Sequence, residues 1–254
     1  MSVSFIVFIS GIIVAAASGL IGSLLTLRKM TLLSDALSHV ALPGIAIGIL
    51  FNFAPIWGGV AFLFLGALLI WAIEKKTKLA TESITGVLFV TALAIGALLI
   101  PEESLLETFF GNVHLISNST AYIQALIATA IILITLRLLK PLTLTSIAPD
   151  LAVASKISRT QMEILLLLLI AGTIAVGISF VGVLLMSSLL IVPAVAAKNI
   201  ATSFKGFVGM SIGISMFSLC VGLILGNIYS INPGIATALT SSVLFLISLF
   251  FPSK

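Results

Sequence analysis

An acidic side chain and an imidazole, Asp35 and His39, stand four residues apart in an otherwise apolar stretch of the chain. In an α-helix, residues at this spacing lie one above the other on one face. A carboxylate and a neutral imidazole are good ligands for a divalent transition metal. Two ligands are too few for tight binding, but a symmetric dimer would combine two of each, which suits tetrahedral Zn²⁺ or, with added waters, Mn²⁺ or Fe²⁺. The spacing therefore predicts a metal half-site, with a structural Asp–His hydrogen bond and a proton relay as the alternatives.

The segment 101–120 carries a second group of candidate residues. It holds His114 beside Gly111-Asn112, three acids and no Lys or Arg; the acids are Glu102, Glu103 and Glu107. An acidic mouth would concentrate cations, although acids are also simply tolerated in an outer loop. His114 is a candidate ligand where an ion enters, against the plainer interpretation of a solvated loop histidine.

The segment 141–161 contains Pro149-Asp150, a pair typical of a helix start, with the acid near the positive end of the helix dipole. We expect a short helix there. It is a candidate docking point for another subunit, with Asp150 as the coupling residue. A plain amphipathic surface helix is the alternative.

The composition limits the kind of protein that can position these residues. Of the 254 residues, 60% are hydrophobic and 8% are charged, whereas a soluble domain is about half apolar and a quarter charged. This excludes a soluble enzyme. The long continuous apolar runs favour helices over a barrel, whose strands would alternate. Because each span needs about 20 residues, the sequence predicts an all-α polytopic membrane protein of about eight or nine spans, with residues 1–254 as a single domain.

The apolar runs predict where these spans lie, and the positive charges predict their orientation. All twelve Lys and Arg fall at alternate span ends. By the positive-inside rule, the N-terminus is then outside and the C-terminus cytoplasmic, which makes 101–120 an outer loop and 141–161 a cytoplasmic coupling loop. Two short runs joined at 177–180 leave an alternative of eight full spans and a partial one. The expected spans are 3–27, 34–50, 56–73, 83–100, 121–139, 162–178, 181–197, 206–226 and 234–251.

Asp35 is the single acid away from the cytoplasmic end of an expected span, because Glu163 stands at the cytoplasmic end of 162–178. The helical rise places Asp35 roughly 10 Å and His39 roughly 16 Å beyond the basic pair Arg28-Lys29, near the middle of the membrane. An ionisable pair there is costly unless it faces a cavity, a partner or an ion. Pro43 follows one turn on and frees backbone groups, as is common beside transport sites.

Small residues recur at the four-residue spacing that lets helices approach closely. We expect them to be packing features. The pairs are Gly44/Gly48, Gly209/Gly213 and Gly222/Gly226.

Several functions lack their motifs in this sequence. There is no G-x-x-x-x-G-K-[ST] phosphate loop, so any ATP that drives transport binds to another chain, and we expect no cofactor in this one. There is no H-E-x-x-H motif, which argues against an intramembrane metalloenzyme. No Lys/Arg cluster interleaved with aromatic residues indicates nucleic-acid binding.

The stretch RKMTLLSDALSHVALPGIAIG, Arg28 to Gly48, resembles the signature of the permeases of zinc, manganese and iron uptake ABC importers. Similar segments follow in the family's order: FGNVHLIS (110–117), IAPDLA (147–152) and SFVGVLLMSSLLIVPAVAA (179–197). The resemblance covers nearly the whole chain. The family usually has a glycine a few residues after the coupling acid, whereas Ser155-Lys156 stand in that neighbourhood here.

This resemblance implies a type II-like permease subunit, not an enzyme, in the cell (plasma or inner) membrane. It implies a homodimer with the metal pathway at its interface and with Asp35 and His39 at the positions of the metal site. Two cytoplasmic ATP-binding subunits would dock around Asp150, and an extracytoplasmic metal-binding protein would deliver the ion. The alternative is an ion-coupled secondary transporter that uses Asp35 and His39 as a relay.

Overall fold

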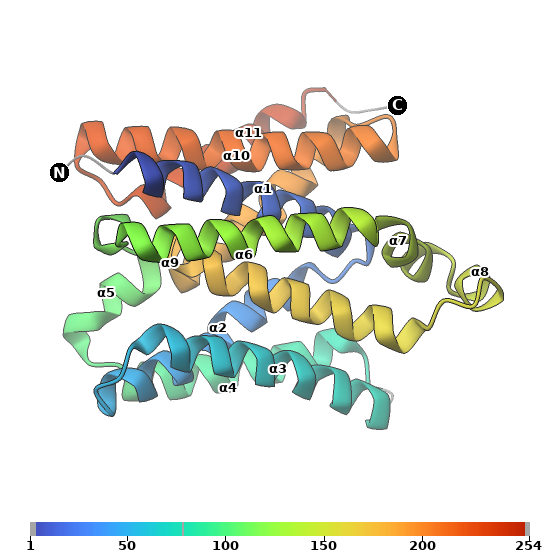
Figure 1. Cartoon of the computed structure of the whole chain (residues 1–254), viewed down its shortest axis with the longest axis horizontal. Helices are drawn as coiled ribbons and strands as arrows, with labels where there is room; N and C mark the ends of the chain where they lie inside the picture. Colours follow the sequence, from blue (N-terminus) through green and yellow to red (C-terminus); the bar gives the residue numbers. More distant parts are fainter. Residues whose placement is uncertain (1–3, 78, 252–254) are drawn as a thin grey trace.

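The computed structural model describes residues 4–77 and 79–251, and the described chain is helical, with no strand in those two ranges (Figure 1). Seven helices of the described residues are long and apolar enough to cross a membrane, and α11 (Pro233–Ser248) is apolar but shorter. The seven are α1 (Phe5–Leu27), α2 (Thr31–Leu50), α3 (Pro55–Thr77), α4 (Thr81–Leu99), α6 (Asn118–Arg137), α9 (Arg159–Ile200) and α10 (Phe204–Tyr229). The prediction of an all-α polytopic fold is confirmed.

The helix α9 consists of two helical segments joined by a kink at Gly182. A straight helix of its 42 residues would be roughly 63 Å long, about twice the thickness of the hydrocarbon core. Gly182 instead has φ 80° and ψ 168°, and the chain turns back there (Figure 1). This agrees with the two spans expected at 162–178 and 181–197.

The expected joint at 177–180 was wrong by a few residues, because those residues are helical and mostly buried. The break falls at Gly182, where the backbone at the end of α5 approaches closely. A Cβ added at Gly182 would lie 2.3 Å from the carbonyl oxygen of Phe109, so a glycine is required there.

Successive long helices run back and forth between two ends of the molecule (Figure 1). The α5 end holds α5 (Glu102–Phe110) and the 3₁₀ helix η1 (Val113–Leu115), so the expected outer loop is largely helical. The opposite, α7–α8 end holds α7 (Leu139–Ile147) and α8 (Pro149–Ala154). The described basic residues lie at helix termini on the α7–α8 end: Arg28, Lys29, Lys75, Lys76, Arg137, Lys140, Lys156, Arg159, Lys198 and Lys205. Lys78 and Lys254 lie outside the described residues.

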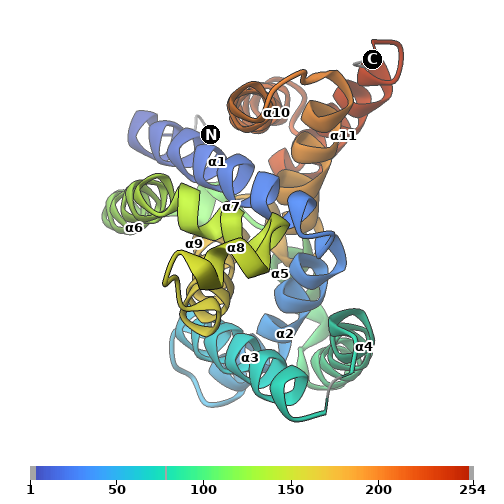
Figure 2. The ribbon, with the colours of Figure 1, turned by 90° about the vertical axis from the view of Figure 1, so that its right-hand side faces the viewer.

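The helix α2 packs against α3, α4 and α9 (Figures 1 and 2). Glycines bring its backbone close to α3. A Cβ added at Gly44 would lie 2.1 Å from the carbonyl oxygen of Gly58, and one at Gly48 would lie 2.5 Å from Cα of Pro55. The packing role predicted for this pair is confirmed, and it fixes α2 firmly beside α3.

The other two glycine pairs differ from each other. Added Cβ atoms at Gly222 and Gly226 would meet α11 and the turn before it. Gly209 and Gly213 face open space, with no described atom within 4 Å of an added Cβ. The packing role expected for this last pair is therefore wrong within the described chain.

Candidate functional site

Asp35 and His39 lie one turn apart on α2, and their side chains approach without touching. Asp35 Oδ1 and His39 Nε2 are 3.9 Å apart, too far for a hydrogen bond. Two metal–ligand bonds of about 2.1 Å would together span about 4.2 Å, so one ion can contact both atoms. The geometry thus leaves room for a metal ion between them, and the direct Asp–His hydrogen bond is not formed.

The two side chains differ sharply in exposure. His39 is 3% exposed and Asp35 is 37% exposed. The His39 ring stands edge-on to Phe89 of α4, with centroids 4.7 Å apart and planes at 87°. Its Nδ1 is buried and has no hydrogen-bond partner among the described residues. Packing therefore holds this imidazole in place, while the carboxylate beside it stays accessible.

The backbone of α2 favours a polar site at this position. Pro43 lies inside the helix and has no N–H to donate to the carbonyl of His39, four residues earlier. His39 is the ninth residue of the 20-residue helix, about 12 Å from its start at Thr31. The imidazole is therefore near the middle of the helix, and Asp35 lies one turn nearer the α7–α8 end.

One chain supplies only part of a metal site. Within residues 4–77 and 79–251, no group of three or more His, Cys, Asp or Glu side chains is placed to hold a metal ion. Asp35 and His39 bring one oxygen and one nitrogen ligand, whereas a tetrahedral site needs four. Asp35 and His39 therefore do not by themselves complete a tetrahedral site.

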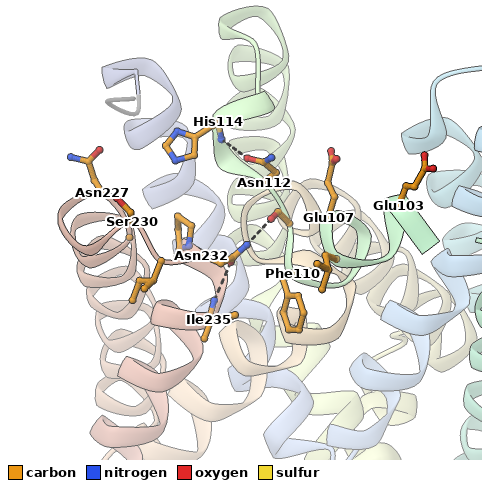
Figure 3. Close-up of a pocket in the computed structure, with 14 residues that line it drawn as sticks. Glu103, Glu107, Phe110, Asn112, His114, Asn227, Ser230, Asn232 and Ile235 are labelled. Atoms are coloured by element: carbon orange, nitrogen blue, oxygen red, sulfur yellow. Dashed lines mark hydrogen bonds between the residues drawn. The ribbon is translucent and has the colours of Figure 1, made fainter. Parts of the chain in front are cut away.

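His114 lies at the α5 end, on the rim of a cavity of about 700 Å³ (Figure 3). It is exposed, and its backbone N–H donates to Asn112 Oδ1 over 3.2 Å. Figure 3 shows His114 on one side of Asn112 and the carboxylates of Glu103 and Glu107 on the other. The cavity wall is thus acidic on one side, but these three groups do not converge as ligands of one ion.

Asn232 is a structural residue of this cavity that sequence reasoning missed. Its Nδ2 donates to the carbonyl oxygen of Gly111 over 2.9 Å, and its Oδ1 accepts from the backbone N–H of Gly234 over 2.8 Å. It thereby caps α11 and ties it to the segment after α5 (Figure 3). The signal in the sequence is Asn232-Pro233, a helix-start pair.

A second cavity, of about 390 Å³, is lined by part of the same segment. Glu107, Gly111 and Asn112 line both cavities. Ile45 and Ile49 of α2 line only the second one. The acidic mouth therefore borders a cavity that reaches the helix carrying Asp35 and His39.

The predicted short helix at Pro149-Asp150 is present as α8, with Asp150 exposed in its first turn. Two apolar neighbours, Leu151 and Val153, are 61% and 64% exposed. Lys156, which stands near the family's usual glycine, has φ 58°, the left-handed conformation that glycine adopts readily. The turn that ends α8 is therefore formed even though Lys156 stands near the position of the family's usual glycine.

Comparison with known proteins gives a family for this chain. Residues 2–252 match the model of the ABC 3 transport family. The "High-affinity zinc uptake system membrane protein ZnuB" of Haemophilus influenzae is 32% identical, with 97% of this chain and 96% of that protein covered. The "Manganese import system permease protein ScaB" of Streptococcus parasanguinis is 29% identical, with 97% and 89% covered.

A solved structure supports the same relation in three dimensions. It is described as "PsaBC from Streptococcus pneumoniae in complex with Fab". The matched chain superimposes on this one with a TM-score of 0.86 at 28% identity, and the match covers 98% of this chain and 91% of that one. The fold of this chain is therefore shared, over nearly its whole length, with a chain of that solved structure.

Proposed function

We propose that this chain, which belongs to the ABC 3 transport family, is the membrane permease subunit of an ATP-driven importer of a divalent transition metal. Its relatives include a zinc uptake protein and a manganese import permease. The observation that carries the proposal is the pair Asp35–His39, spaced so that one ion can contact both atoms. Because carboxylate and imidazole ligands suit zinc, manganese and iron, we propose this class of metals as the substrate.

Two copies of the chain form the translocation pathway. Most residues of α2 are buried, yet the side chain of Asp35 is 37% exposed. A carboxylate open to its surroundings inside a membrane is costly unless it meets a partner, a cavity or an ion. A two-fold axis beside α2 would bring together two Asp35 and two His39, which gives one ion four nitrogen and oxygen ligands.

Two ATP-binding subunits dock at α8. Asp150 stands exposed in the first turn, next to the exposed apolar side chains of Leu151 and Val153. Apolar groups gathered on a projecting helix are typical of a protein–protein contact. The sequence lacks a phosphate-binding loop, so ATP is bound and hydrolysed on those partner subunits.

The basic residues at the α7–α8 end support a cytoplasmic position for that end and an outer position for the α5 end and the N-terminus. A metal-binding protein delivers the ion at the α5 end, where Glu103 and Glu107 attract cations. The ion pauses between Asp35 and His39. ATP binding and hydrolysis then shift the two permeases relative to each other, and the ion is released inside.

Substitution Asp35→Asn tests the site. It keeps the side-chain shape but removes the charge and the stronger ligand. In vesicles that contain the complete transporter, we expect initial metal uptake to fall by more than about a hundredfold, since even the loss of a partner behind a metal ligand costs about 10–100-fold. The purified complex should keep its subunit composition. Glu82→Gln, which removes an exposed carboxylate at the α7–α8 end, is the matched control and should transport normally.

Two results would contradict parts of this proposal. Normal uptake by Asp35→Asn would show that the ion does not bind there. Uptake by this chain alone, in vesicles with an ion gradient and no ATP, would instead establish the ion-coupled secondary transporter.

A further inference from the structure

Arg28, at the junction of α1 and α2, reaches across to the end of α7. Its Nε donates to Ser146 Oγ over 2.6 Å, and its Nη2 donates to Thr145 Oγ1 over 3.1 Å. Thr145 and Ser146 are the two residues directly before Ile147, where α7 ends. The helix α8, which carries Asp150, begins two residues after Ile147.

Both hydroxyl groups are oriented to accept from Arg28. The Ser146 hydroxyl donates to the carbonyl oxygen of Leu142 over 2.6 Å. The Thr145 hydroxyl lies 3.0 Å from the carbonyl oxygens of Pro141 and Leu142, to which it donates. Because both hydroxyl protons are already donated within α7, the two oxygens can only accept from Arg28. A guanidinium has N–H groups on separate nitrogens that can reach both oxygens at once, and a lysine ammonium does not.

Arg28 also faces the helix that follows α8. It lines a cavity of about 310 Å³ together with Thr145, Ser146 and Glu163, the last of these on α9. Burial lowers the pKa of the Arg28 guanidinium below its ordinary value, and the nearby Glu163 carboxylate opposes this shift only in part. Glu163 is itself held by Arg159, with Arg159 Nε donating to Glu163 Oε1 over 2.6 Å. The Arg28 side chain therefore lies between α7 and α9, the two helices that flank the proposed coupling helix α8.

The junction that carries Arg28 is a tight turn and not a flexible linker. The backbone N–H groups of Arg28 and Met30 donate to the carbonyl oxygens of Leu24 and Leu25, both over 3.1 Å. Lys29 between them has φ 58°. The helix α2 begins directly afterwards at Thr31, one turn before Asp35. A displacement of Arg28 would therefore be passed to the start of the helix that carries Asp35 and His39.

We propose that Arg28 is a positioning residue that links the ATPase-docking segment α7–α8 to the metal-binding helix α2, through its paired hydrogen bonds to Thr145 and Ser146. This inference rests on the proposed function. Movement of α8 on ATP binding pulls on the end of α7, and Arg28 transmits it to the start of α2. Without this link, ATP hydrolysis continues but moves fewer ions.

The test measures metal ions imported per ATP hydrolysed by the complete transporter in vesicles. Two variants break the same link from opposite sides: Arg28→Gln replaces the charged, two-armed donor by a shorter neutral amide that cannot reach both hydroxyl groups, and Thr145→Val with Ser146→Ala removes the acceptors and keeps the arginine. We expect each to lower the ratio about tenfold, since hydrogen bonds to a charged group contribute enough free energy for a change of that size. All three substitutions together should lower it no further than either set alone.

Two further variants separate the link from charge and from stability. Lys29→Asn removes a positive charge from the same turn, at a left-handed position that asparagine tolerates, and should keep the wild-type ratio. Arg28→Lys restores the charge without the fork and should leave the ratio well below that of the wild type.

A wild-type ratio in the Arg28→Gln or the Thr145→Val/Ser146→Ala transporter would overturn the inference. If Arg28→Gln does not assemble, the variant that lacks the acceptors decides alone. A wild-type complex that imports no metal would instead refute the proposed function, so the two failures are distinguishable.

Discussion

The two histidines of the chain occupy opposite surroundings. His39 is buried on α2 with a carboxylate 3.9 Å away, and glycines fix this helix against α3. His114 is exposed on a three-residue 3₁₀ helix at the α5 end, and its acidic neighbours lie across Asn112 (Figure 3). Both regions hold an imidazole and at least one acid. Only on α2 does one rigid element set the distance between them.

This difference shows what residue spacing can and cannot predict. Asp35 and His39 share one helix, so the helical repeat alone brings them together. Glu103, Glu107 and His114 belong to α5 and η1, and their relative position depends on the turn at Gly111, which has φ 71°. A cluster of acids around a histidine in sequence therefore does not imply a converging set of ligands.

Paired substitutions of the two histidines give the largest expected contrast. We expect His39→Gln to lower initial metal uptake by more than about a hundredfold, because a ligand is lost that packing alone holds in place. His114→Gln should change uptake by less than about twofold, since an exposed histidine without converging partners contributes little. Both variants are measured in vesicles at the same protein density, with the melting temperature of each complex as the control for folding.

A reversed result would break the contrast. If His114→Gln lost uptake and His39→Gln kept it, the outer cavity would be the principal ion site and the pair on α2 a packing feature.

Much of the fold could be predicted because apolar runs report directly on burial in a membrane. The run that ends at Leu27 and the one that ends at Leu50 match the ends of α1 and α2 as the structure has them. The pair Pro149-Asp150 predicted the start of α8 because a helix start depends on local chemistry.

What could not be predicted depends on contacts between distant segments. The kink at Gly182 exists because the backbone at Phe109 approaches it, more than 70 residues away in the chain. The partners of Arg28, Thr145 and Ser146, lie more than 110 residues further on. Charge and composition gave no sign of either contact.

The second contrast concerns how firmly α2 is held. Gly44→Ala would place a Cβ 2.1 Å from the carbonyl oxygen of Gly58, so α2 and α3 must move apart. We expect a loss of stability of about 1–3 kcal/mol, as for other overpacked contacts, seen as a lower melting temperature of the purified chain. Gly209→Ala and Gly213→Ala, at open positions, should leave the melting temperature unchanged or raise it, because alanine favours helix over glycine.

If Gly44→Ala melted like the two control variants, the close approach of α2 to α3 would not stabilise the bundle. The position of α2, and with it of Asp35 and His39, would then not depend on this contact.

The smallest expected effect belongs to the acidic mouth. Glu107 is exposed and lines both cavities at the α5 end, so its charge acts on an arriving cation through water. We expect Glu107→Gln to lower the initial uptake rate about two- to threefold at low ionic strength and to have no effect at high ionic strength, where the charge is screened. Uptake rates measured below saturation across a range of salt concentrations check this. A loss that persists at high salt would mean that Glu107 binds the ion directly, which would make the outer mouth a true ligand site and remove its contrast with α2.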